Sequence, residues 1–244
     1  METVIYIPFK NAALDYAGQF LVNSGITATS MVGSDVTHLL LPVPAFDFEK
    51  ELDRLLRQLP DTVCVIGGSL NHSNPEKYPM IDLLQDPFYV AENAAITAHC
   101  ALKYIWNALP VTLDGQPVLI IGWGRIGKCL ARLLRSMGAA VTILARKETD
   151  RAIARALGYA CICPDADLSR FRVIVNTAPA VLFSEAQMKQ CRQDCCKLDL
   201  ASVKGLPGQD VVWARGLPGK DAPESSGKLI ADAIIRIFNS KEVL

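Results

Sequence analysis

The chain has 244 residues, half of them hydrophobic, and its 25 basic residues balance its 25 acidic residues. This length allows one large domain or two small ones with a substantial core, and the neutral balance provides no general attraction for nucleic acid or an anionic membrane. Three histidines are too few for a histidine-rich metal site, and the eight cysteines lack the paired spacing of a zinc site, so no metal is expected.

The N-terminal segment predicts a first strand rather than a targeting signal. It reads METVIYIPFKNAALD, with an acidic Glu2 and no basic region before the apolar residues. No run in the chain approaches the ~18 apolar residues of a membrane-spanning helix. We therefore expect a cytoplasmic protein whose cysteines are reduced thiols.

The first third of the chain alternates between strand and helix patterns. Apolar runs predict buried strands at residues 3–9, 37–46 and 62–68. Helical spacing predicts helices at residues 11–25 and 47–60, the first of them closed by Gly25. Such alternation is typical of a parallel sheet covered by helices, so we predict a smaller N-terminal α/β domain over residues 1–88.

The rest of the chain repeats this rhythm more clearly. A long helical pattern at 92–108, ended by Pro110, precedes it as a bridging helix. Apolar runs then indicate strands near 117–121, 141–144, 160–163, 172–176, 196–201 and 211–214. Helical patterns indicate helices near 125–137, 150–157 and 184–190, and a last helix from about Ala222.

These elements predict an α/β protein of two domains, a Rossmann-type doubly wound parallel sheet and the smaller N-terminal domain. We place the Rossmann domain, with the bridging helix, at residues 89–226. The remaining residues, 227–244, are expected to form a C-terminal helix.

Three glycines, Gly122, Gly124 and Gly127, form the pattern G-x-G-x-x-G between a predicted strand and a predicted helix. In a dinucleotide-binding turn the first glycine permits the tight turn, the second lets the backbone approach a pyrophosphate, and the third lets helix and strand pack closely. The phosphates then meet N–H groups at the helix start, here at Arg125 and Ile126. The context predicts dinucleotide binding, with a plain strand-to-helix turn as the alternative.

The residues after the second strand of this unit bear on the choice between NAD and NADP. An acidic residue about 20 residues past the turn would bind the ribose hydroxyl of NAD. Arg146 and Lys147 occupy that place here, and Arg151 follows one helical turn later. A guanidinium matches a phosphate in charge and geometry, so we expect NADP as the cofactor. A solvated basic loop is the alternative.

Two further loops should face the cofactor, because they leave the carboxyl ends of predicted strands. They are NTAPA, residues 176–180, and DLAS, residues 199–202. Asn176, Thr177 and Ser202 offer polar groups for ribose or nicotinamide, although ordinary turn chemistry is the alternative. The residues expected at the cofactor are Thr177, Ala178, Pro179, Ala201 and Ser202.

Polar residues on the bridging helix suggest a substrate-facing side. Asn93, Thr97 and Cys100 lie at i, i+4 and i+7, so they share one face of a helix otherwise rich in apolar residues. A cleft would accommodate such a face, and solvent is the alternative. We take Asn93 and Thr97 as candidate substrate ligands.

The segment at residues 216–220 is a glycine-rich bend ahead of the last predicted helix. Backbone N–H groups at a helix start, with a lysine beside them, can hold a carboxylate. The alternative is a capped turn that only joins two elements. The residues expected at the substrate here are Leu217, Pro218, Gly219, Lys220 and Pro223.

Together, GWGRIG, NTAPA, DLAS and GLPGKDAP with a following Gly227 resemble the family of the dipicolinate synthase A subunit, as do LLPVPA and NAAIT. The resemblance covers residues 85–238 best and implies a fold related to 2-hydroxyacid dehydrogenases. It implies NADP-linked oxidation of dihydrodipicolinate, a small dicarboxylate, to dipicolinate during sporulation. It also implies a flavoprotein-like B subunit as partner, and a homo-oligomer stays open.

The chain departs from that family at substrate-side positions. His99 and Cys100 stand where the family has glutamate and glycine, and Glu224 replaces a lysine. Because the reaction removes a hydride from one carbon and a proton from its neighbour, the candidate catalytic residues are Lys220, which would hold a carboxylate, and His99, as base. The alternatives are a non-catalytic NADP(H)-binding subunit or sensor that partners a flavoprotein, or a different 2-hydroxyacid or shikimate-type dehydrogenase.

Overall fold

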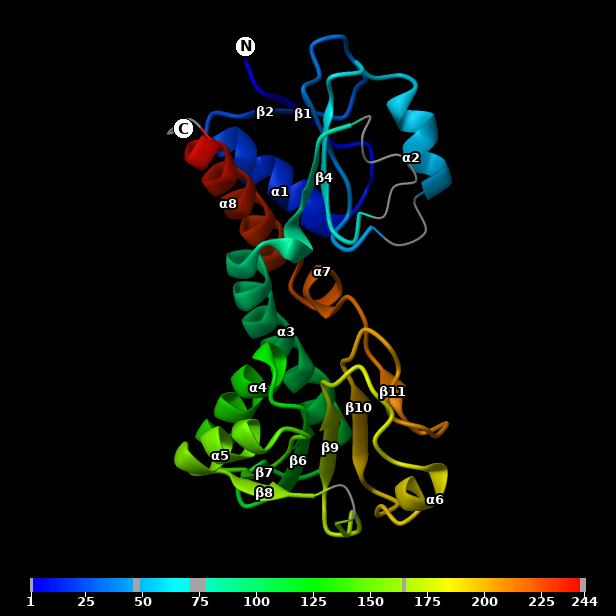
Figure 1. Ribbon diagram of the computed structural model, residues 1–244, viewed down its shortest axis with the longest axis vertical. Helices are drawn as coiled ribbons and strands as arrows, with labels where there is room; N and C mark the ends of the chain where they lie inside the picture. Colours follow the sequence, from blue (N-terminus) through cyan, green and yellow to red (C-terminus); the bar gives the residue numbers. More distant parts are fainter. Residues whose placement is uncertain (1, 46–48, 71–77, 164–165, 242–244) are drawn as a thin grey trace. The chain divides into compact units, whose positions relative to one another are not determined.

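The chain forms two parallel sheets, one in each of two compact units (Figure 1). The computed structural model describes residues 2–45, 49–70, 78–163 and 166–241. The first unit comprises residues 1–93 and 218–244, and the second comprises residues 94–217. The predicted fold class, α/β with a Rossmann-type sheet, is confirmed. Within the described residues, none of the helices combines the length and apolar character that crossing a membrane requires.

The sheet of the first unit has the strand order β2-β1-β3-β4-β5, and every neighbouring pair is parallel. Its strands are β1 (Val4–Tyr6), β2 (Thr27–Thr29), β3 (His38–Leu40), β4 (Cys64–Gly67) and β5 (Met80–Asp82). Side chains alternate between the two faces, so Tyr6, Leu39 and Val65 pack in one apolar cluster with Leu52 and Leu55. The last two belong to α2 (Glu49–Leu56), which therefore covers this face.

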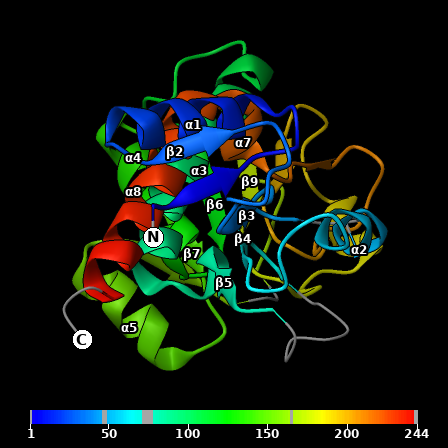
Figure 2. The same ribbon diagram turned by 90° about the horizontal axis from the view of Figure 1, so that it is seen from above.

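The other face of that sheet carries α1 (Ala12–Asn23) and the C-terminal helix α8 (Pro223–Lys241), which lie side by side (Figures 1 and 2). The Asn11 side chain accepts hydrogen bonds from the N–H groups of Ala13 and Leu14 and so begins α1. The two helices approach closely at Gly227, where a Cβ would lie 2.4 Å from the Ala13 carbonyl oxygen. Packing on α1 thus places the C-terminal helix in the first unit. The second unit ends at residue 217, whereas the predicted Rossmann domain extends to residue 226.

The sheet of the second unit has the order β11-β10-β9-β6-β7-β8, again parallel throughout. Read from β8 and numbered in chain order, this is 3-2-1-4-5-6, the Rossmann arrangement. Its strands are β6 (Pro117–Ile121), β7 (Ala140–Leu144), β8 (Ala160–Ile162), β9 (Val173–Asn176), β10 (Cys196–Asp199) and β11 (Val212–Trp213). All six lie within or beside the predicted runs, because buried strands on a parallel sheet read as continuous apolar segments.

The remaining helices agree with the predicted pattern except at three places, one of which is a short 3-10 helix at 83–85 that the sequence pattern does not predict. They are η1 (Leu83–Gln85), α3 (Pro87–Ala108), α4 (Arg125–Ser136), α5 (Glu148–Ala156), α6 (Glu185–Met188) and α7 (Leu217–Asp221). The bridging helix α3 begins earlier than residue 92, because Pro87 suits a first helical position and the Asp86 carboxylate accepts the Phe88 N–H at 3.0 Å. The predicted bend at 216–220 is instead largely the single helical turn α7, since only Gly216 has a positive φ there.

Candidate cofactor site

A pocket of about 380 Å³ lies in the second unit at the carboxyl ends of β6, β7 and β9. The strand order reverses between β6 and β9, and open α/β sheets bind their ligands at such a point. Its lining consists of Gly122, Trp123, Gly124, Leu144, Ala145, Arg146, Lys147, Asp150, Thr177, Ala178, Pro179, Ala180 and Leu182.

Each glycine of the turn after β6 has its own structural reason. Gly122 has φ +98°, and a Cβ there would lie 2.6 Å from Thr177 Oγ1. A Cβ on Gly127 would lie 2.4 Å from the Gly122 carbonyl oxygen, so this residue lets α4 pack against the turn. A Cβ on Gly124 would meet nothing within 4 Å, which leaves open space beside the backbone. Gly124 is thus the position where a pyrophosphate has room to approach.

The first turn of α4 presents its N-terminal N–H groups without a side-chain cap. The N-cap residue is Gly124, which has no side chain that could accept a hydrogen bond from these N–H groups. The first turn also contains no acidic residue. Arg125, Ile126 and Gly127 follow it directly. The positive end of the helix dipole and these N–H groups favour a phosphate at this position.

The floor of the pocket is held by the loops after β9 and β10. Thr177 donates through its hydroxyl to the Ile121 carbonyl oxygen at 2.9 Å. Asn176 is only 1% exposed; its amide donates to the Ala178 carbonyl oxygen and to Asp199 Oδ1, both at 3.0 Å. The suggestion that Asn176 offers its side chain to a ribose is therefore wrong, because both ends of that amide are engaged within the protein.

The loop after β7 carries the charged residues of the pocket. Arg146 and Lys147 are exposed and line it together with Asp150, whereas Ala145 is buried. Arg151 lies outside the lining, because its guanidinium donates to the carbonyl oxygens of Ala145 and Arg146 at 2.7 and 2.9 Å. Arg151 thus braces the loop that presents the two cations.

A second interaction holds the Arg151 side chain in that orientation. Arg151 and Arg155 both pair with Glu148 at the start of α5. Hydrogen bonds from Arg155 and Arg151 lower the pKa of the Glu148 carboxyl below its ordinary value. The three side chains form a surface network next to the pocket rather than within it.

Of the thirteen residues predicted at the cofactor, seven line the pocket, and six do not: Arg125, Ile126, Gly127, Arg151, Ala201 and Ser202. Those that share the pocket are Gly122, Gly124, Arg146, Lys147, Thr177, Ala178 and Pro179. Ala201 is buried and accepts the Trp213 indole N–H at 3.0 Å, and Ser202 is exposed; neither lines the pocket. Asp150 also lines the pocket, although the sequence pattern does not predict it there. The pattern for NAD binding places an acidic residue at the end of the second strand, whereas Asp150 lies in the first turn of α5.

The predicted substrate residues divide between the two units. On α3, Thr97 and Cys100 are buried, so a solvent-facing side is excluded for them, whereas His99 is exposed. Asn93 is partly buried at the end of the first unit's part of the chain. Lys220 is exposed in α7 and Pro223 begins α8. Leu217 and Pro218 are buried, and Gly219 is partly buried.

Comparison with known proteins agrees with the nucleotide pocket. Residues 104–195 match the family model of the D-isomer specific 2-hydroxyacid dehydrogenase, NAD binding domain. The chain is 26% identical over 193 residues to the A subunit of dipicolinate synthase from Bacillus subtilis, covering 71% of this chain and 64% of that protein. It is 35% identical over 108 residues to a probable formaldehyde dehydrogenase AdhA of the same organism, covering 41% of this chain and 30% of that protein. The chain thus spans less than two thirds of either relative.

The fold is shared over nearly the whole chain with a solved structure. The A subunit of dipicolinate synthase from Bacillus halodurans superposes with a TM-score of 0.84 at 20% identity, covering 97% of each chain. The resemblance noted from the sequence motifs is thereby confirmed in sequence and in fold. The matched segment is similar to the NAD binding domain of D-isomer specific 2-hydroxyacid dehydrogenases, and this similarity indicates a nicotinamide cofactor.

Proposed function

We propose that this chain is an NADP(H)-dependent oxidoreductase. The observation that carries the proposal is the pair of exposed cations, Arg146 and Lys147, that line the pocket just beyond β7. Buried Ala145 stands at the strand end, where an acidic residue would repel a 2′-phosphate. An arginine fork and an ammonium group supply opposite charge and hydrogen-bond donors for that phosphate.

The rest of the pocket suits the parts that NAD and NADP share. Open space at Gly124 and the uncapped start of α4 would hold the pyrophosphate. Thr177, Ala178 and Pro179 form a neutral wall toward the rest of the dinucleotide. The bound nicotinamide would supply hydride transfer.

Asp150 is the observation that favours NAD as a second candidate. Its carboxylate lines the same pocket from the first turn of α5, where it could accept hydrogen bonds from ribose hydroxyls. At this end of the pocket the positive charges of Arg146 and Lys147 outnumber the negative charge of Asp150, so we favour NADP with its additional phosphate. Calorimetric titration of the purified chain with NADP⁺ and NAD⁺ separates the two, since tighter binding of NAD⁺ would assign the pocket to that cofactor.

For the reaction, we propose oxidation of dihydrodipicolinate to dipicolinate, supported by the similarity to the A subunit of a dipicolinate synthase. Lys220 and the backbone of residues 217–219 would hold a substrate carboxylate, with Pro223 at the start of the following helix. Asn93, which belongs to the same unit as Lys220, would orient the ring. Thr97 and exposed His99 belong to the second unit and stay the candidates on α3 for orienting the ring and for accepting the proton that leaves as the ring becomes aromatic.

We further propose that a flavoprotein-like B subunit is the partner and that the chain works in the cytoplasm of a sporulating cell. The test of the reaction adds NADP⁺ to freshly made dihydrodipicolinate and follows the absorbance of NADPH and dipicolinate. Formation of both in equal amounts supports the proposal. Tight cofactor binding with no turnover of any pyridine dicarboxylate would instead indicate a binding subunit or redox sensor.

A further inference from the structure

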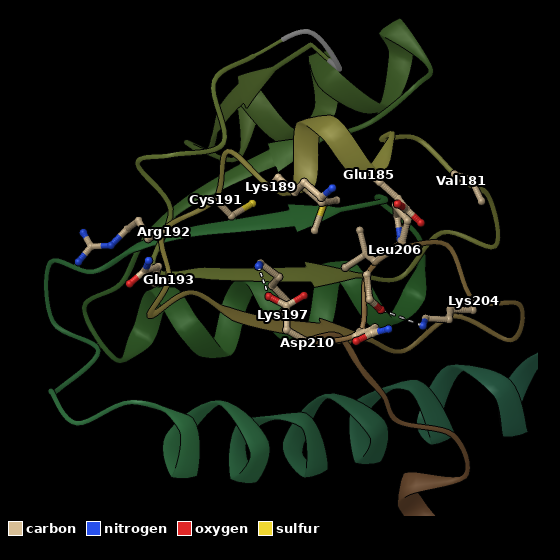
Figure 3. A pocket seen from close by; sticks show the side chains of 14 residues that line it. Val181, Glu185, Lys189, Cys191, Arg192, Gln193, Lys197, Lys204, Leu206 and Asp210 are labelled. Atoms are coloured by element: carbon tan, nitrogen blue, oxygen red, sulfur yellow. Dashed lines mark hydrogen bonds and ion pairs between the residues drawn. The ribbon is translucent and has the colours of Figure 1, made fainter.

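A second pocket, of about 820 Å³, lies in the second unit and shares no lining residue with the cofactor pocket (Figure 3). Its wall is formed by α6 and the turn after it, the start of β10, and the loop at 204–210. Cys191 lines the pocket from that turn, and Lys197 lines it from β10. The chemistry of this pocket is not used by the function proposed above.

The charged side chains around this pocket are mostly basic. The lining contains four basic and two acidic side chains. The basic residues are Lys189, Arg192, Lys197 and Lys204, and the acidic residues are Glu185 and Asp210. Lys197 forms an ion pair with Asp210, and Lys204 donates to the Gly208 carbonyl oxygen at 3.3 Å. Within the described lining, basic charge remains in excess, which suits a ligand that carries carboxylates.

Cys191 does not stand alone, because the Cys195 thiol lies close enough to lower its pKa, while Cys195 Sγ also donates to the Cys196 carbonyl oxygen at 3.7 Å. Backbone hydrogen bonds hold the two ends of the connecting turn: the Cys191 N–H donates to Met188 and the Cys195 N–H donates to Arg192, at 3.3 and 3.1 Å. Both cysteines are partly buried against the apolar cluster that includes Met188. The two thiols are therefore held together, with one of them facing the pocket.

The surroundings shift the pKa values of the two thiols in opposite directions. The hydrogen bond from Cys195 and, more weakly, the charge of Lys197 lower the pKa of Cys191 to about 7, although burial and Asp210 oppose this. The same hydrogen bond and burial raise the pKa of Cys195 well above its ordinary value. A partly exposed thiol with a lowered pKa beside a second thiol is the arrangement that supports thiol–disulfide exchange.

Cys196 provides the matched comparison within the same segment. It follows Cys195 directly but lies in β10, where successive side chains point to opposite faces. Since Lys197 lines the pocket, Cys196 faces the other side of the sheet. Burial raises the pKa of Cys196 to about 11, so this thiol is not expected to react.

We propose that Cys191 and Cys195 are a redox-active thiol pair, and that the basic pocket admits a small disulfide bearing carboxylates. The Cys191 thiolate attacks one sulfur of that disulfide, its S–S bond breaks, and one half leaves as a thiolate. Cys195 then gives up its proton to the leaving thiolate and attacks Cys191 Sγ. The Cys191–Cys195 bond forms and the second half leaves as a thiolate that takes a proton from water, so two protein thiols are oxidised while one disulfide is reduced to two thiols.

The experiment uses the full chain and oxidised glutathione as the probe. Trypsin cleaves after Lys189, Arg192 and Lys197, so Cys191 and Cys195 fall in the separate peptides Gln190–Arg192 and Gln193–Lys197. After incubation, free thiols are alkylated, and mass spectrometry is expected to find these two peptides joined by a reducible bond. Cys196→Ser should retain the joined peptides, whereas Cys195→Ser should lose them and retain glutathione on Cys191.

The rate of alkylation of Cys191 gives a second measurement that does not depend on disulfide formation. The peptide Gln190–Arg192 contains a single cysteine, so its labelling by iodoacetamide reports Cys191 alone. The rate should rise with pH around a midpoint near 7, and Cys195→Ala, which removes the donor at this position, should shift that midpoint upward and slow alkylation at pH 7. Lasting glutathione on Cys191 in the unsubstituted chain, a joined peptide that survives Cys195→Ser, or a midpoint unchanged by Cys195→Ala would overturn the proposal.

Discussion

The side-chain amide of Asn176 donates to Asp199 Oδ1 at 3.0 Å, and this buried contact joins the loops that follow β9 and β10. The Asp199 carboxylate is fully buried and also accepts the N–H groups of Ala201, Gly205 and Leu206 at 3.0, 2.7 and 2.8 Å. One carboxylate thus satisfies four donors. Because Asn176 in turn binds Ala178, the contact sets the wall of the cofactor pocket.

Replacement of this carboxylate should cost stability. In Asp199→Asn, an amide NH₂ faces backbone N–H groups, so at least one buried donor loses its acceptor. We expect the free energy of unfolding in urea to fall by about 2–3 kcal/mol. Asp232→Asn is the matched control, since Asp232 is half exposed and pairs with Lys228 on the surface of α8, and its effect should stay below about 0.5 kcal/mol. Equal losses in the two variants would contradict the structural role of Asp199.

Two alanine substitutions in the glycine turn should separate binding from folding. Gly124→Ala places a methyl group in open space, so stability should be kept while the affinity for NADP⁺ falls at least about tenfold, because the methyl excludes the pyrophosphate. Gly127→Ala forces a methyl against the Gly122 carbonyl oxygen and should lower the free energy of unfolding by about 1–3 kcal/mol. Thermal unfolding and calorimetric titration measure both quantities, and a Gly124 variant that binds normally would rule out the phosphate position.

The charges after β7 should decide which cofactor binds. Arg146→Asp should weaken NADP⁺ by about ten- to a hundredfold through loss of a charge-assisted contact to the 2′-phosphate, and leave NAD⁺ nearly unchanged. Asp150→Asn should strengthen NADP⁺ by removing the acid that shares the pocket. Arg132→Asp, an equal charge change on the exposed part of α4, is the control. A parallel fall in NAD⁺ and NADP⁺ affinity in Arg146→Asp would defeat the electrostatic argument.

The ion pair between Lys197 and Asp210 should show a stability effect that depends on pH. Asp210 is largely exposed, whereas the Lys197 side chain is 6% exposed, so Asp210→Asn leaves a buried ammonium group without its partner. We expect the free energy of unfolding to fall by about 1–2 kcal/mol at pH 7. Lys197→Met should cost less, because it removes the buried charge as well.

The sign of the pH dependence follows from the carboxylate. The hydrogen bond and charge of Lys197 lower the pKa of Asp210 below its ordinary 3.8. The stabilisation that the ion pair adds to the folded state is therefore complete at pH values above 3.8, and it is lost as the pH falls through the lowered pKa. Urea unfolding at pH 7 and in the acid range should therefore show the difference between the unsubstituted chain and Asp210→Asn shrink on acidification. A difference that grows toward low pH would be incompatible with this ion pair.

The sequence alone determined the elements whose cause is local. Most strands of the second unit are rich in apolar residues, and the turn at Gly122 needs a positive φ that glycine adopts readily. These features depend on neighbours within a few residues, so periodicity and residue type suffice to predict them. The two cations after β7 likewise follow from their place in the strand–turn–helix order.

Tertiary structure decided where side chains point and which helix pairs with which. Arg151 turns back to the carbonyl oxygens of Ala145 and Arg146 instead of lining the pocket, and Asp150, one residue earlier, lines it. The C-terminal helix packs on α1 because Gly227 allows a close approach, although the two helices are about two hundred residues apart in the chain. Such choices depend on rotamers and on surfaces contributed by distant segments, and no local pattern in the chain encodes them.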